Sequence, residues 1–126
     1  MKRREAREKA VQTLFQLDNT DMSIEDAIPF IMEKPINPFY ETLVKGTTEH
    51  RDEVDEELSS KLENWSLERL PKIERTILRM AVYELLYNDE VPHRVVLNEA
   101  VELCKQFGDE KSGRFVNGVL SKFEEK

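Results

Sequence analysis

A chain of 126 residues is long enough for one domain with a hydrophobic core, and 39% apolar residues, 36% charged residues and only four glycines are typical of a soluble helical protein. The longest stretch without a charge, residues 10–17, is far shorter than the ~20 residues that cross a bilayer, and no apolar segment follows the basic start; this excludes a membrane protein and a secreted one, and a cytoplasmic location is expected. The net charge of −7 divides into +3 over residues 1–9, −9 over 10–63 and −1 over 64–126, which favours a local anion-binding site on an acidic body.

Residues 3–18 are predicted to form the first helix. Its apolar residues recur at helical spacing and make one stripe: Ala6, Ala10, Val11, Leu14 and Leu17. Arg3 and Arg7 fall in line with this stripe, and Arg4 lies beside it. Arginines are tolerated in line with a core face where a helix projects beyond the body of the protein, so we expect these three side chains on an open surface. The alternative is a frayed, solvated helix end.

Two further helices are predicted in the acidic part of the chain. Ser23 resembles an N-cap that opens a short helix, which Pro29 is expected to kink or to keep very short. Asn37 as N-cap and Pro38 at the first helical position then predict a long helix. Apolar residues at three- and four-residue spacing extend it over residues 38–64 as one amphipathic rod with an acidic outer face.

The helix predicted over residues 71–88 has no continuous polar face in its second half, so we expect it in the interior with other helices packed around it. Four charged side chains interrupt its apolar surface: Glu74, Arg75, Arg79 and Glu84. Each must reach solvent, pair inside the protein or meet another molecule. For Glu84 we expect hydrogen bonds from backbone N–H groups or from a nearby arginine.

Two more helices complete the predicted order. Apolar residues from Val95 to Phe107 predict one helix that ends at Gly108, and Ser112 is expected to cap a last helix that continues to about Phe123. No strand or hairpin pattern occurs in the sequence. The predicted fold class is therefore all-α.

No motif for catalysis, nucleotide binding or metal binding occurs, which predicts a protein without enzymatic activity, cofactor or metal. The two histidines, His50 and His93, lie in different elements, and each is expected to be a surface residue or a partner of a helix end. Cys104 is the only cysteine, which excludes an internal disulfide. A buried, inert thiol is expected there.

The chain closely resembles the NusB family of bacterial transcription antitermination proteins through four blocks in this order and spacing: RREAREKAVQTLFQ, KIERTILRMAVYELLY, DEVPHRVVLNEAVELCKQFG and KSGRFVNGVLSKF. Residues 19–64 match the family mainly in length and helical pattern. The resemblance implies about seven helices in two small packed helical bundles. It also implies a single NusB-like RNA-binding domain over residues 1–126, with an N-terminal helical half over about 1–65 and a C-terminal helical half over about 66–126.

The resemblance further implies a non-enzymatic role: together with the ribosomal protein NusE, NusB-like proteins bind boxA-type single-stranded RNA of ribosomal RNA leaders and help RNA polymerase to resist termination. The RNA-binding residues that it implies are Lys2, Arg3, Arg4, Arg7, Arg114, Phe115 and Asn117. For the NusE-type partner it implies Glu74 and Arg75 as an exposed charge pair. Glu5 interrupts the basic run found in some family members, so fewer phosphate contacts are expected.

Two other classes of function stay open from the residues alone. One is a helical protein-interaction module that uses the acidic rod, with the basic start incidental. The other is a regulatory domain related to the NusB-like domain of certain ribosomal RNA cytosine methyltransferases, although no cofactor-binding domain precedes Lys126. Binding to boxA-like RNA, with and without the NusE-type protein, separates these classes.

Overall fold

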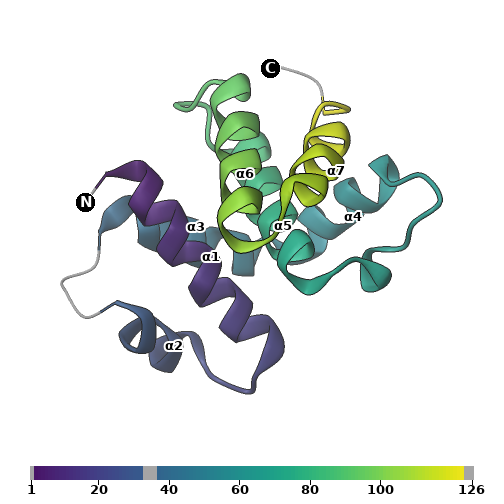
Figure 1. The fold of residues 1–126 in the computed structure, drawn as a ribbon. Coiled ribbons are helices and arrows are strands. Elements are labelled where there is room, and N and C mark those ends of the chain that lie inside the picture. The colour runs from purple at the N-terminus through teal and green to yellow at the C-terminus, as the bar shows by residue number, and fades with distance from the viewer. Residues whose placement is uncertain (1, 33–36, 124–126) are drawn as a thin grey trace.

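The computed structural model describes residues 2–32 and 37–123 as a packed set of helices (Figure 1). In chain order these are α1 (Arg3–Asn19), α2 (Ile24–Ile31), α3 (Pro38–Glu49), α4 (Arg51–Lys61), the 3-10 helix η1 (Leu67–Arg69), α5 (Lys72–Tyr87), α6 (His93–Phe107) and α7 (Glu110–Leu120). The described residues contain no strand, and the all-α prediction is confirmed. Among them, no helix is both long and apolar enough to cross a membrane.

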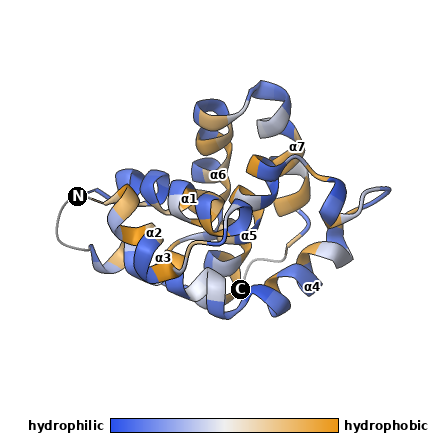
Figure 2. Ribbon diagram, turned by 90° about the horizontal axis from the view of Figure 1, so that it is seen from below, coloured by the Kyte–Doolittle hydropathy of each residue, from blue (hydrophilic) through white to orange (hydrophobic). Residues whose placement is uncertain are grey.

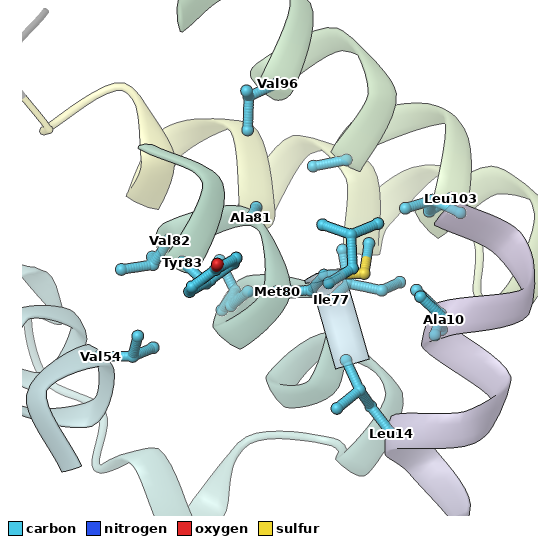
Figure 3. Packing of buried hydrophobic residues seen from close by; sticks show 14 of the residues in the cluster. Ala10, Leu14, Val54, Ile77, Met80, Ala81, Val82, Tyr83, Val96 and Leu103 are labelled. Atoms are coloured by element: carbon cyan, nitrogen blue, oxygen red, sulfur yellow. The ribbon is translucent and has the colours of Figure 1, made fainter. Parts of the chain in front are cut away.

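Helix α5 lies at the centre of the molecule, as its apolar sequence predicts (Figure 1). It contacts α1, α3 and α4, which precede it in the sequence, and α6 and α7, which follow it. Its residues from Thr76 to Glu84 are all buried. In Figure 3, Ile77 and Met80 lie between Ala10 of α1 and Val54 of α4. The surrounding helices are amphipathic, with hydrophobic and hydrophilic residues following one another along α1, α4 and α6 (Figure 2). Burial of apolar faces on α5, together with direct packing of α1 on α2 and α3 and of α6 on α7, holds the helices together.

The predicted rod over residues 38–64 is in fact two helices, α3 and α4. The break falls at His50, whose backbone (φ −102°, ψ 17°) departs from helical values. The ring of His50 stacks on Tyr87 of α5, with 4.2 Å between ring centroids. Thr47 before the break and Val54 after it are both buried, so the apolar spacing runs through the bend unchanged. Periodicity could therefore not reveal the break.

The second correction to the rod concerns its end. Helix α4 ends at Lys61 rather than near residue 64, and Asn64 adopts a left-handed backbone conformation with φ of 63°. Asparagine tolerates this conformation better than most residues, which fits a chain reversal at this point. Trp65 therefore lies in the connection to η1, where it is 54% exposed instead of facing a core.

The starts of α2 and α3 are as predicted. The Ser23 hydroxyl accepts a hydrogen bond from the N–H of Asp26, and α2 is a short helix of eight residues with Pro29 inside it. The side chain of Asn37 accepts from the N–H groups of Phe39 and Tyr40. These bonds satisfy amides that have no partner within their own helix.

The start of α7 differs from the prediction that Ser112 caps it. The N-cap is Asp109, whose carboxylate accepts a hydrogen bond from the N–H of Ser112 at 2.7 Å, and this bond lowers the pKa of Asp109. Aspartate caps as well as serine does, so the helix begins at the first suitable residue after Gly108. Ser112 is left inside the helix, where its hydroxyl donates to Glu74 at 3.0 Å.

The arginines of α5 pair with carboxylates from α1 and α4. Arg79 makes a bidentate contact with Asp55, at 2.8 and 3.0 Å, and also reaches Asp18 at 3.3 Å. Asp18 receives a second hydrogen bond from Arg75 at 3.0 Å and a third from Arg51 at 3.1 Å. This cluster ties the end of α1 and the first turns of α4 to the central helix.

Candidate nucleic-acid interface

The first turn of α1 presents basic side chains at the surface. Lys2, Arg3 and Arg4 are all exposed, as the sequence predicts for the start of this helix. The guanidinium of Arg3 lies 4.7 Å from the ring centroid of Phe39 in α3, which is a cation–π contact. The carboxylate of Glu90 lies 3.9 Å from the same guanidinium, so Arg3 is exposed but has partners on two sides.

Arg7 is buried, which corrects the expectation that it faces an open surface. Its side chain is 3% exposed and donates two hydrogen bonds, at 3.0 and 2.8 Å, to the carboxylate of Glu84. Helix α1 has come to lie against α5 one turn after Arg3, so the stripe that contains Arg7 faces the interior. The expectation that buried Glu84 takes a nearby arginine is thereby confirmed.

Glu99 of α6 lies between the buried pair of Arg7 and Glu84 and the exposed Arg4. Its carboxylate accepts hydrogen bonds from Nε and Nη2 of Arg4 at 3.2 and 2.8 Å, and Nη1 of Arg7 lies 3.7 Å away. Further along the same two helices, Gln106 donates to Glu8 at 3.0 Å. Polar side-chain contacts thus join the first turns of α1 to α6.

A groove of about 680 Å³ opens on the outer side of α6, between the start of α1 and α7. Its lining residues come from those three helices and are Arg4, Asn98, Val101, Glu102, Lys105, Glu110, Gly113, Arg114 and Asn117. A second hollow of about 290 Å³ adjoins it and shares Arg4, Glu102 and Lys105. The groove thus brings together three of the residues that the resemblance implies for RNA: Arg4, Arg114 and Asn117.

Phe115 does not line this groove. It is half-buried on another side of α7 and packs against the core, and its ring meets Trp65 edge-on with 6.2 Å between centroids. The two rings line a separate hollow of about 260 Å³, together with Leu70, Pro71, Glu74, Asp109, Lys111 and Ser112. The structure therefore places Phe115 and Glu74 at one site and Arg114 and Asn117 at another.

Glu74 and Arg75 do not form the expected exposed charge pair. Both are half-buried at the start of α5. Glu74 accepts from the Ser112 hydroxyl of α7, and Arg75 donates to Asp18 of α1, because successive residues of a helix point to different neighbours. Glu74 also lines the hollow beside Trp65 and Phe115.

The cysteine thiol and a histidine imidazole, groups that many enzymes use in catalysis, are both packed against other parts of the fold here. Cys104 is buried, and burial raises the pKa of its thiol to about 12. Nε2 of His93 lies 3.0 Å from the carbonyl oxygen of Phe123, at a helix end as expected. Among the described residues, no group of three or more His, Cys, Asp or Glu side chains is placed to hold a metal ion.

Comparison with known proteins decides the family. The model of the NusB family matches residues 4–125. The chain belongs to the NusB family. A transcription antitermination protein NusB of Lysinibacillus sphaericus is 66% identical over 125 residues, which cover 99% of this chain and 98% of that protein.

Solved structures of NusB-family proteins share the fold. NusB of T. maritima superposes with a TM-score of 0.87 at 35% identity, over 97% of this chain and 89% of that one. A chain from a crystal structure of antitermination factors NusB and NusE in complex with dsRNA superposes with a TM-score of 0.84 at 32% identity, over 94% and 92% of the two chains. The four sequence blocks were thus sufficient to identify a NusB-family member.

Within this NusB-family fold, sequence reasoning missed Glu99 and Lys105. Both lie in α6, and Asn98, Glu102 and Lys105 recur at four- and three-residue spacing on one side of that helix. This polar spacing, opposite the apolar stripe, was the available signal for a second surface. The pairing of Glu99 with Arg4 had no such signal, because 95 residues separate the two.

Proposed function

We propose that this NusB-family chain is a non-enzymatic, cytoplasmic antitermination factor that binds boxA-type single-stranded RNA of ribosomal RNA leaders together with a NusE-type ribosomal protein. The observation that carries the proposal is the groove across α6, in which Arg4 of α1 and Arg114 and Asn117 of α7 line one surface. Lys2 and Arg3 extend the basic surface at the exposed start of α1.

The chemistry of the groove suits a single strand. Guanidinium groups bind phosphates through paired N–H donors and stack on bases through their flat faces, and the side-chain amide of Asn117 can pair with a base edge. Lys105 adds a cation on the floor formed by α6. The acidic remainder of the protein, with a net charge of −7 for the whole chain, confines nucleic acid to this face.

Two of the implied RNA residues take different roles in the proposal. Arg7 lies behind the surface, where its bonds to Glu84 fix the start of α1 on α5, and it orients the exposed arginines rather than touching RNA. Phe115 lies at the hollow beside Trp65, on another side of α7 from the groove, and we assign its ring to the partner site rather than to RNA.

We place the NusE-type partner at the start of α5. Glu74 lines the hollow with Trp65, which is exposed, and the apolar walls and carboxylate rim suit a basic side chain of a ribosomal protein. Arg75 does not touch the partner in this proposal; its hydrogen bond to Asp18 of α1 holds the start of α5 in place. Because Trp65 is the only tryptophan in the chain, its fluorescence should change when the partner binds.

The domain organisation is also part of the proposal. We treat residues 1–126 as a single RNA-binding domain with halves of about 1–65 and 66–126, supported by the contacts of α5 with helices of both halves. The alternative functions, a helical interaction module or a methyltransferase-type regulatory domain, find less support, because neither calls for exposed cations gathered at one groove.

The experiment that tests the proposal is a gel-shift titration of boxA-like single-stranded RNA, with and without the NusE-type protein. Retention of the RNA by the chain, and tighter retention with the partner present, is the expected result. A scrambled RNA of equal length is the control. Absence of retention under both conditions would contradict the proposal and favour the interaction module.

A further inference from the structure

Arg4 is one of three residues shared by the groove and the adjoining hollow, yet part of its guanidinium is already bound. Nε and Nη2 donate to the two carboxylate oxygens of Glu99 at 3.2 and 2.8 Å. This bidentate arrangement is the one that arginine also uses with phosphate. It leaves Nη1 outside the pair.

Glu99 is held more firmly than Arg4. The side chain of Glu99 is 13% exposed and that of Arg4 is 64% exposed. Beneath them, Nη1 of the buried Arg7 lies 3.7 Å from Oε1 of Glu99, so the carboxylate stands between two arginines. A phosphate that approaches Arg4 from the groove must either displace Glu99 or bind beside its negative charge.

We propose that Glu99 limits the RNA affinity of the groove by occupying Arg4 in the way that a phosphate would. This inference rests on the proposed function and names a residue that determines the strength of binding at that site. Glu99 and Arg4 neutralise one another while Arg7 is neutralised by Glu84, so the basic start of α1 attracts RNA less than its composition implies.

The direct test is Glu99→Gln, measured by fluorescence anisotropy with boxA-like single-stranded RNA. Glutamine keeps the size of the side chain and one acceptor oxygen for Arg4, and it removes the negative charge. Affinity at about 0.1 M salt should rise by roughly three- to tenfold, since a repulsive unit charge near the phosphate is lost. The slope of log affinity against log salt should steepen by about 0.7, because Arg4 then neutralises one more phosphate.

Glu102→Gln is the matched control. Glu102 is exposed on the same helix, lines the same groove and carries the same charge, but it pairs with Lys105 at 3.5 Å and not with Arg4. Its replacement should raise affinity less. Repeating both changes in an Arg4→Ala background isolates the coupling: the gain from Glu99→Gln should disappear, and the gain from Glu102→Gln should persist.

The outcomes separate this inference from the function on which it rests. Failure of the unmodified protein to bind the RNA, alone or with the NusE-type protein, removes both. Binding by the unmodified protein with unchanged or weaker binding by Glu99→Gln removes the inference alone, as does an equal gain with and without Arg4. Melting curves of each variant show that it is folded. Glu99→Ala removes the same charge, so its affinity for the RNA should also rise, which tests the inference with a second variant.

Discussion

At the scale of single residues, the buried pair of Arg7 and Glu84 is the feature that most changes the interpretation of the sequence. The sequence places an arginine in line with the apolar stripe of the first helix and a glutamate in the most apolar helix, and each stands out by itself. The two are 77 residues apart, so only the packing of α1 on α5 shows that each is the other's partner. A buried ion pair depends on both members, because one left alone is an unpaired charge in a poorly solvated place.

Arg7→Glu should destabilise the fold strongly. The new carboxylate would face Glu84 and lie near Glu99, and loss of a partner from a buried ion pair typically costs about 3–5 kcal/mol in the free energy of unfolding. Arg3→Glu, in the same turn but exposed, should change that free energy by less than about 0.5 kcal/mol. Chemical denaturation of the two variants measures the difference. Equal free energies of unfolding for the two variants would contradict the burial of Arg7.

A second residue-scale prediction concerns Asp18 and acid pH. Burial alone would raise the pKa of Asp18, but the hydrogen bond from Arg75 and the charges of Arg79, Arg75 and Arg51 lower it overall from the ordinary 3.8. A lowered folded pKa means that the ionised carboxylate stabilises the fold above the ordinary pKa, and that this contribution is lost as pH falls through the folded value.

Asp18→Asn should therefore lower the free energy of unfolding at pH 7 by about 2 kcal/mol, as expected for lost hydrogen bonds to charged groups. The difference between the variant and the unmodified protein should stay constant down to about pH 4 and shrink at lower pH. Urea unfolding at a series of pH values measures it. A difference that grows on acidification would contradict the assignment of Asp18 as an ionised partner of the arginines.

At the scale of the elements, helix starts and apolar faces follow from the sequence, and close approaches between helices do not. The caps at Ser23 and Asn37 and the central position of α5 were predictable because each rests on neighbouring residues or on composition. The bend at His50 was not, because the apolar spacing continues across it.

Gly46 gives a further example: a Cβ built there would lie 2.1 Å from the ring of Tyr83. Glycine lets α3 approach α5 at this point.

Gly46→Ala should destabilise the protein, while Gly118→Ala in α7 should stabilise it. The first methyl group overlaps the Tyr83 ring, and overpacking of this kind costs about 1–3 kcal/mol or more. The second meets no atom within 4 Å, so the gain in helix propensity of roughly 0.5–1 kcal/mol remains. Thermal melting compares the pair directly. A stabilised Gly46→Ala variant would show that α3 and α5 are not in close contact there.

At the scale of the whole molecule, the candidate interface is a product of the fold. Arg4, Lys105 and Arg114 lie on three helices, and they reach one groove because α1 and α7 both border the outer side of α6. The sequence and its family resemblance supplied the fold class and three of the residues that line the groove, Arg4, Arg114 and Asn117. They could not show that Arg7 turns inward, that Phe115 lies at another site or that Glu99 binds Arg4, because each of these depends on distant parts of the chain that meet only after folding.

The measurement that tests this interface most directly is the salt dependence of affinity for boxA-like single-stranded RNA, in the unmodified protein and in Arg114→Ala. If Lys2, Arg3 and Arg114 each neutralise one phosphate while Glu99 occupies Arg4, log affinity should fall against log salt with a slope of about −2, and Arg114→Ala should reduce the steepness of that slope by about 0.7. Arg94→Ala, which removes an exposed arginine of α6 outside the groove lining, should leave the slope unchanged. Affinity that is independent of salt, or equal slopes for Arg114→Ala and the unmodified protein, would contradict RNA binding in this groove.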